Sequence, residues 1–240
     1  MAKPILILIF TMLTSLVTAQ VNELGLILGG SNHFGDVGTS TFIRPNSLAS
    51  GVIYKFNKTP RVAYRASLSK LVISPDDADS FNEIQNSFKS SLNKSITELS
   101  LGFEFNFYEY NLAYREQEGT PYLFLGLSAI QFDAAQSLAT SVLPNINVNY
   151  AKERTLAIPF GIGYKRKLFG KLAFAIETRI QYTFTDNLDD GKFISEEILP
   201  INYPNKEKFN NPKTNDWYSF TGISLVYTFG RPACYTSTIR

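Results

Sequence analysis

The sequence predicts an all-β fold: an eight-stranded antiparallel up-and-down transmembrane β-barrel with long extracellular loops and short periplasmic turns. Two runs alternate apolar and polar residues for more than ten positions. Such runs exceed the usual length of about five or six residues and suit a tilted membrane strand of about 9–11 residues. Six further segments show the pattern less clearly, so the strand number is even, and the connections alternate between long and short.

The clearest alternation lies at residues 95–110 and 171–186. The first run, SITELSLGFEFNFYEY, places on one face Leu99, Leu101, Phe103, Phe105 and Phe107. The second run, KLAFAIETRIQYTFTD, does the same with Leu172, Phe174, Ile176, Ile180, Tyr182 and Phe184. Because successive side chains of a strand point to opposite faces, each run predicts one apolar and one polar face.

The six other candidate strands are residues 22–30, 50–57, 61–70, 121–132, 157–166 and 218–229. Segment 121–132 is apolar on both faces, so its orientation stays open. The long connections are residues 31–49, 71–95, 133–156 and 185–217; the short ones follow Asn57 and Arg166, and 109–119 is intermediate. Outer-membrane barrels place short turns in the periplasm and long loops outside. We therefore expect both termini in the periplasm and the chain in the outer membrane.

Charged residues occupy the faces opposite the apolar stripes. They are Lys55, Arg65, Glu98, Glu104, Lys165, Glu177 and Arg179. A Lys or Arg at mid-membrane on the lipid face costs about 2–4 kcal/mol, so these side chains are expected to point inward. Eight strands leave an interior that side chains can fill. We expect opposite charges to pair there and the barrel to have no useful conductance.

The N-terminal residues predict export. Residues 1–19 carry Lys3, an apolar run and the small-residue pattern of a signal peptidase site, Val17-Thr18-Ala19. The alternative, a membrane anchor, would need an apolar run of about 20 residues, and this run is shorter. The expected division is a signal peptide at 1–19, a barrel at 20–230 and a periplasmic C-terminal tail at 231–240.

The charge balance argues against nucleic acid as a partner. Removing Lys3 from the 23 basic residues leaves 22 against 21 acidic ones, a net charge of +1. Phosphate binding needs a surplus of Lys and Arg on one face. Lipid is the partner that a membrane barrel requires.

The only histidine, His33, allows a catalytic interpretation. Together with Ser31 and Asp36 it could carry out acyl transfer on lipid; alternatively it is an exposed loop residue. No G-x-S-x-G or comparable motif accompanies it. We expect no enzyme activity, no small-molecule substrate and no cofactor.

No metal site is expected either. The acidic stretches at 74–80 and 185–191 lack the EF-hand pattern, and one Cys with one His cannot form a zinc site. Gly29, Gly30, Gly35 and Gly38 do not fit a phosphate-binding loop; we expect these glycines to let the first strand bend into its loop.

Cys234 is the only cysteine of the chain and follows the last candidate strand. In an oxidising compartment an odd cysteine predicts an intermolecular disulfide or a reactive free thiol. A buried, inert cysteine is the other interpretation, although the residues around it, including Arg231, are polar. The residues alone leave these alternatives open.

Several motifs, in this order, resemble one family. They are ELGLILGGSNHFGDVG, SITELSLGFEFNFYEYN, LAIPFGIGYK, YTFTDNLDD and TNDWYSFTGISLVYTFGRPACY. Together they are similar to the PorG-type outer-membrane barrels of the type IX secretion machinery, the DUF6089 family, from about residue 22 to residue 235. The resemblance implies a non-enzymatic component that anchors a periplasmic ring complex to the outer membrane, with a ring lipoprotein as partner.

The resemblance also implies which residues contact the partner. The ending FGRPACY matches that of the family, which favours an intermolecular disulfide at Cys234. The expected contacts in the periplasmic turn and tail are Arg115, Glu116, Arg231 and Tyr235. The alternative function is a surface adhesion or binding barrel that acts through its extracellular loops.

Overall fold

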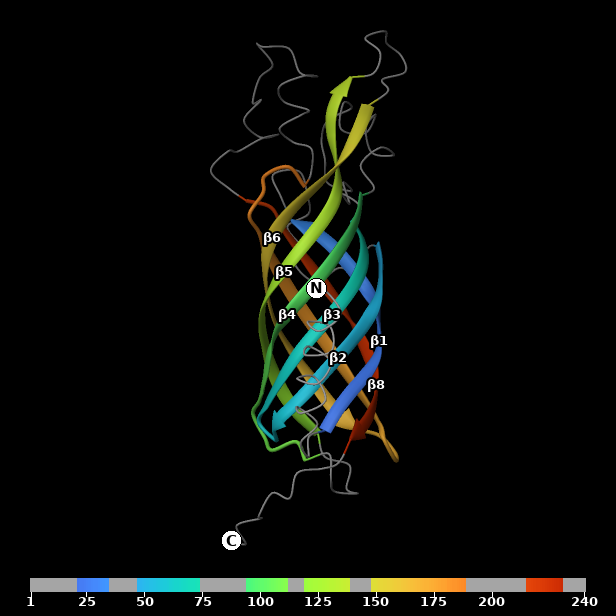
Figure 1. Ribbon diagram of the computed structural model, residues 1–240, viewed down its shortest axis with the longest axis vertical. Helices are drawn as coiled ribbons and strands as arrows, with labels where there is room; N and C mark the ends of the chain where they lie inside the picture. The colour runs from blue at the N-terminus through green and yellow to red at the C-terminus, as the bar shows by residue number, and fades with distance from the viewer. Residues whose placement is uncertain are drawn as a thin grey trace, which may run out of the picture.

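The chain forms a closed barrel of eight antiparallel strands, each paired with its neighbours in sequence (Figure 1). The computed structural model describes residues 21–34, 47–73, 94–111, 119–138, 148–188 and 215–230. The strands are β1 (Val21–Phe34), β2 (Ser47–Thr59), β3 (Val62–Ile73), β4 (Lys94–Asn106), β5 (Gly119–Leu138), β6 (Val148–Lys167), β7 (Leu172–Thr183) and β8 (Trp217–Gly230). Pairing of β1 with β8, from Val21↔Gly230 to Phe34↔Trp217, closes the sheet. The predicted fold class is confirmed.

Because apolar and polar residues alternate along the strands, apolar side chains face the lipid and charged ones face the lumen. On β4, Leu99 and Leu101 are exposed on the outer surface, whereas Glu98 and Glu104 are fully buried. The orientation of β5, which the sequence left open, places Leu125 outside and Tyr122, Phe124 and other alternate residues inside. The outer surface of the belt is thus largely apolar, and the charged side chains of these strands face the lumen.

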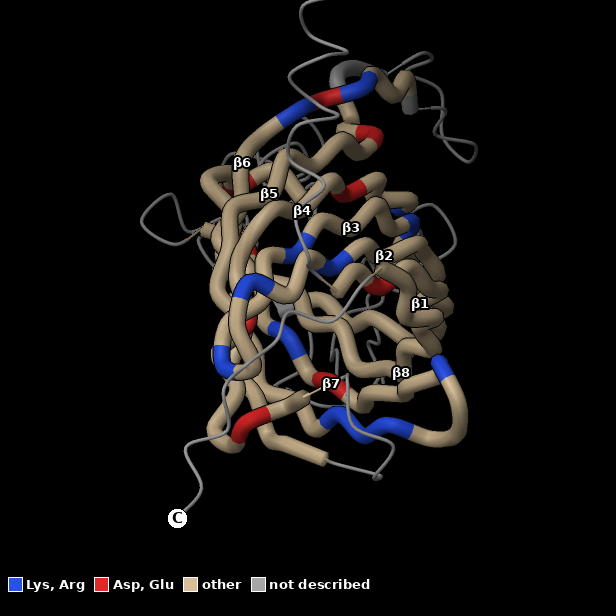
Figure 2. The backbone as a smooth tube through the Cα atoms, turned by 60° about the horizontal axis from the view of Figure 1, so that its bottom comes forward, with Lys and Arg blue, Asp and Glu red and all other residues tan. Residues whose placement is uncertain are grey.

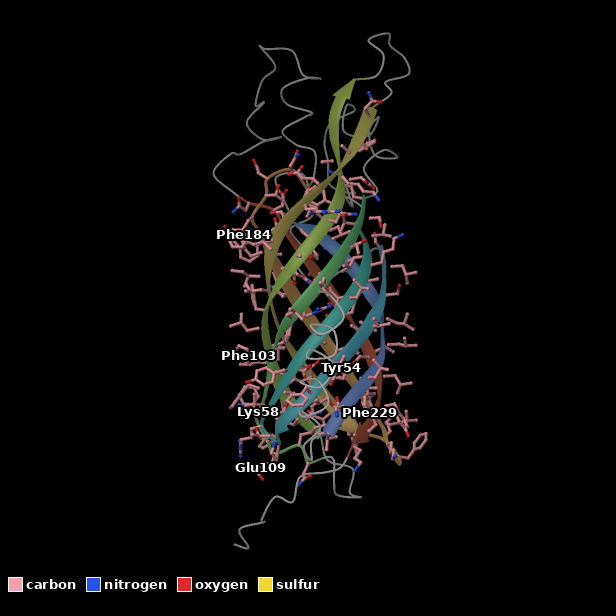
Figure 3. The ribbon with its side chains drawn as sticks, in the orientation of Figure 1. Tyr54, Lys58, Phe103, Glu109, Phe184 and Phe229 are labelled. Atoms are coloured by element: carbon pink, nitrogen blue, oxygen red, sulfur yellow. The ribbon has the colours of Figure 1, made fainter. Side chains whose placement is uncertain are left out.

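Aromatic side chains mark both edges of the apolar belt. Near the loop end, Tyr182 packs edge-on against Trp217 and Phe184, with ring centroids 4.9 Å and 5.4 Å away. Towards the turn end the exposed rings include Tyr54, Phe103, Phe105, Tyr227 and Phe229, some of which are labelled in Figure 3. Aromatic girdles above and below an apolar band characterise membrane-spanning barrels. The chain is therefore a transmembrane barrel of the outer-membrane type.

No helix among the described residues is long and apolar enough to cross a membrane.

The expected loop at 133–156 is wrong at both of its ends. Strand β5 continues to Leu138 and β6 begins at Val148, with Asp133 opposite Lys152. The two strands project beyond the rest of the barrel as an arm (Figure 1). The sequence hid this arm because the outward face becomes polar beyond the belt, at Gln131 and Arg154. The pattern of outward apolar side chains therefore ends at the edge of the belt, whereas the strands continue beyond it.

The expected role of the glycines in β1 is also wrong. The strand does not end at Gly30 but continues to Phe34. Gly29 lies opposite Gly222 of β8, and a Cβ at Gly29 would lie 2.9 Å from the Phe220 ring and 2.4 Å from the carbonyl oxygen of Thr221. The glycine therefore leaves room for close approach of β8 and for an aromatic ring in the lumen, rather than for a bend.

The lumen has two layers. Apolar side chains fill the half nearer the loops; they include Ile27, Leu71, Ile96, Ile130, Phe132 and Phe220. Most of the buried charged residues lie in the half nearer the turns, only two to five positions from the strand ends. In Figure 2, which brings the turn end forward, basic and acidic positions are interleaved around the barrel.

We predict that the position of a new charge on β4 decides its cost. Leu101→Arg, at an exposed belt position, should lower the free energy of unfolding by about 2–4 kcal/mol, and Thr97→Arg, at the belt edge, by about 0–1 kcal/mol. Urea unfolding in lipid vesicles, followed by the fluorescence of the only tryptophan, Trp217, measures both. Equal costs at the two positions would contradict the placement of the belt.

Candidate functional site

The centre of the buried charge cluster is Arg65, on β3. Its guanidinium bridges two carboxylates: Nη1 lies 3.3 Å from Glu104 Oε1, and Nη1 and Nη2 both donate to Glu177, the Nη2 bond to Oε1 being 3.0 Å long. Glu104 is on the neighbouring strand β4, whereas Glu177 is on β7 across the barrel. A planar guanidinium suits this double contact because its donors form a fixed fork.

Glu104 is surrounded by three cations. Lys55 Nζ lies 2.7 Å from Oε1, and Lys165 Nζ lies 2.9 Å from Oε2, in addition to Arg65. All four side chains are at least 97% buried. Without Glu104, Lys55 and Lys165 would be buried beside Arg65 with no paired carboxylate, so Glu104 offsets the positive charge of this part of the lumen.

Glu177 completes the cluster on the opposite wall. Arg179 Nε lies 2.9 Å from Oε1, and the Tyr122 hydroxyl donates to Oε2 at 2.7 Å. Both oxygens therefore have at least two neighbours that donate or carry positive charge. A buried carboxylate is stable only when it is paired and hydrogen-bonded in this way.

Aromatic rings cover the cations of the cluster. The Phe124 ring centroid lies 4.5 Å from Arg65 Cζ, and the Phe220 centroid 4.7 Å from Arg179 Cζ. The Tyr122 ring lies near both lysines, 5.4 Å from Lys55 Nζ and 5.2 Å from Lys165 Nζ. Contacts of this kind stabilise desolvated cations, and the rings also fill the lumen.

All seven residues predicted to point inward are buried: Lys55, Arg65, Glu98, Glu104, Lys165, Glu177 and Arg179. The carboxylate of Glu98 lies outside the ionic pairs and accepts hydrogen bonds from Ser128, 2.9 Å away, and Tyr218, 3.1 Å away.

Two buried carboxyls of the described chain were missed. Asp216, 2% exposed, lies in the expected loop at 185–217, and its Oδ2 accepts a hydrogen bond from the Leu188 main-chain N–H at 2.8 Å. Glu23 on β1 is 1% exposed and lies directly opposite Lys55 of β2. The sequence could have predicted the burial of Glu23: Leu24 and Leu26 face the lipid, so the alternating position of Glu23 faces the lumen.

His33 is buried, 3% exposed, within β1 and opposite Tyr218 of β8. Its interpretation as an exposed loop residue is therefore wrong, because the strand extends further than expected. Ser31 donates its hydroxyl proton to the main-chain carbonyl of Val72 at 2.5 Å, not to His33. Asp36 lies outside the described residues.

The predicted partner contacts Arg115, Glu116, Arg231, Cys234 and Tyr235 all lie outside the described residues, as do the signal peptide at 1–19 and the tail at 231–240. Among the residues that the structure describes, no three His, Cys, Asp or Glu gather as metal ligands. Of the acidic stretches, 74–80 and residues 189–191 also lie outside the described part.

The described surface of the turn end is basic. Its exposed charged residues are Lys58, Arg61, Arg166 and Lys171, against the acidic Glu109. Arg61 donates to the carbonyl oxygen of Phe107 at 2.8 Å and lies 3.7 Å from Glu109, which joins the two neighbouring turns. Among the described residues, this end therefore presents more exposed positive than negative charge.

A family model described as a domain of unknown function, DUF6089, matches residues 2–238. The chain belongs to the DUF6089 family. No curated protein matches it.

Several solved outer-membrane barrels are similar to this DUF6089 chain in fold. A major outer membrane protein of Thermus thermophilus is 14% identical with a TM-score of 0.49, covering 88% of this chain and 100% of that one. The N-terminal barrel domain of Pseudomonas aeruginosa OprF is 10% identical with a TM-score of 0.44, covering 88% and 98%. Ail, the attachment invasion locus protein of Yersinia pestis, is 11% identical with a TM-score of 0.45, covering 88% and 100%.

We predict that Glu104→Gln destabilises the barrel by about 3–5 kcal/mol, because it leaves the buried Lys55 and Lys165 without the carboxylate that pairs them, while Arg65 keeps Glu177. Urea unfolding in vesicles measures the loss. Glu109→Gln is the matched control: this exposed glutamate pairs loosely with Arg61, and its removal should change stability by less than about 1 kcal/mol. A Glu104→Gln barrel as stable as the control would show that the cluster does not hold the lumen together.

Proposed function

We propose that this DUF6089 barrel is a non-enzymatic outer-membrane component of the type IX protein secretion machinery that anchors its periplasmic ring complex to the membrane. The observation that carries the proposal is the filled lumen. The ionic cluster around Glu104 and the apolar layer around Ile130 occupy successive levels of the barrel. A barrel without an open path suits a structural role better than transport through its own interior. The absence of conductance remains a prediction.

The ends of the described barrel support the orientation that anchoring requires. Val21 and Gly230 pair at the turn end, so the first and last strands both begin or end there. In outer-membrane barrels the short turns face the periplasm. With that orientation the basic turn end, which includes Lys58 and Arg166, faces a periplasmic partner.

The chain geometry supports a role for Cys234 on the same side. The residue follows Gly230 by four positions, so the main chain can carry it no more than about 14 Å from the turn end. The resemblance to PorG-type barrels implies a ring lipoprotein as partner. We propose that Cys234 forms a disulfide with it and that Arg115, Glu116, Arg231 and Tyr235 line the contact.

One observation favours the second candidate, an adhesion or binding barrel. The β5–β6 arm stands beyond the other strands at the loop end (Figure 1) and carries Asp133, Lys152 and Arg154 on its outer side. Trimming the loops at this end distinguishes the two functions. It should abolish binding if the barrel is an adhesin, and leave ring anchoring intact if it is an anchor.

We predict that a non-reducing gel of the outer-membrane fraction, with thiols blocked before lysis, shows this chain in a band of higher mass. Reductant and Cys234→Ser should each remove that band, because the variant has no cysteine left. Mass spectrometry of the band should identify a periplasmic lipoprotein. A chain that runs only as a monomer, or a band that contains only this chain, would contradict the proposed cross-link.

A further inference from the structure

The outer surface of β2, β3 and β4 contains a hollow at Ala66. The register places Ala66 between Tyr54 and Leu101 in one row of outward side chains. Because a methyl group stands between two large side chains, a groove of about 450 Å³ opens over it. Its walls are Tyr54, Phe56, Tyr64, Leu101 and Phe103.

The walls of this groove are held in place. Tyr54 donates its hydroxyl proton to Asn22 Oδ1 on β1 at 2.7 Å. Phe56 stacks against Tyr64, with centroids 6.3 Å apart and planes at 23°. The groove is therefore shaped by contacts within the barrel before any ligand enters, which lowers the entropic cost of binding.

The end of the groove nearer the turns carries positive charge. Lys58 is exposed, and its Nζ lies 5.8 Å from the centroid of the Tyr64 ring that forms the wall. Figure 3 shows Tyr54, Phe103 and Lys58 in the turn-end half of the barrel. Arg61, in the same turn, adds a second exposed cation. One site thus combines an apolar channel within the belt and a cation where the belt ends.

We propose that this groove binds one phospholipid of the leaflet at the turn end, with an acyl chain over Ala66 and the phosphate at Lys58. The groove opens on the lipid-facing surface, where hydrocarbon chains are the surrounding medium. A lysine at the belt edge attracts the anionic headgroup. The described charges of this end, four basic and one acidic, complement such a headgroup. The site does not depend on the proposed role in secretion.

Another lysine provides a matched comparison. Lys171 Nζ lies 5.7 Å from the Tyr227 ring centroid, in the turn between β6 and β7. It makes the same contact with an exposed tyrosine, but Tyr227, unlike Tyr64, is not a wall of the groove over Ala66. A general preference of interfacial lysines for lipid would involve both residues equally, whereas a specific site involves only Lys58.

Native mass spectrometry of the full chain in detergent, titrated with phosphatidylglycerol or with dioleoylglycerol, tests the proposal. Dioleoylglycerol has the acyl chains without the phosphate. Ala66→Phe, which fills the groove, should weaken binding of both lipids at least tenfold. Lys58→Gln should weaken binding of phosphatidylglycerol about fivefold and leave that of dioleoylglycerol unchanged.

The controls are Lys171→Gln and Ala129→Phe, the latter adding the same bulk on the outer face of β5. Both should bind each lipid as the unmodified chain does. The side chains changed in all four variants lie on the outer surface, so the lumen stays intact. Heat-dependent gel mobility checks that each variant is folded. Undiminished binding by Ala66→Phe, or equal losses in the controls, would overturn the site. A Lys58→Gln variant that binds phosphatidylglycerol normally would overturn the assignment of the phosphate.

Discussion

The fold depends on the pairing of buried charges, at the centre of which Arg65 joins Glu104 on the adjacent strand to Glu177 across the lumen. Eight strands make a barrel too narrow for bulk water to solvate charged side chains well. Each carboxylate must then be satisfied by cations and hydroxyls of other strands. The cluster therefore ties β7 to β3 and β4, with which β7 shares no backbone hydrogen bond.

The same pairing allows the outer surface within the belt to be largely apolar. Lipid tolerates neither charges at mid-depth nor unpaired backbone groups, so the polar half of each alternating strand must face inward. The lumen accommodates these residues because most of the buried charges lie in the half nearer the turns, whereas apolar side chains dominate the half nearer the loops. With the lumen occupied by paired charges and apolar side chains, the features open to partners or lipid are the turn end, the projecting β5–β6 arm and the groove over Ala66.

The sequence predicted the strands and the inward charges because both follow from one rule, that lipid excludes charge. It could not predict the partners. Arg65 and Glu177 lie 112 residues apart, and alternation assigns a side chain to a face but not to a height in the lumen. The arm was missed because, beyond the belt, water permits polar side chains on the outer face of β5, such as Gln131 and Asp133. The groove was missed because it forms only where Ala66 lies between large side chains of neighbouring strands, which the sequence of one strand does not reveal. The prediction for Cys234 is untested, since this residue lies outside the described residues.

A double-mutant cycle between Arg65 and Glu177 tests the central claim most directly. Free energies of unfolding in vesicles are compared for Arg65→Met, Glu177→Gln, the double variant and the unmodified chain. The account predicts that the double variant loses less than the sum of the single losses, with a coupling of about 1–3 kcal/mol. Losses that add to within about 0.5 kcal/mol would show that the bridge across the lumen is not what closes and stabilises the barrel.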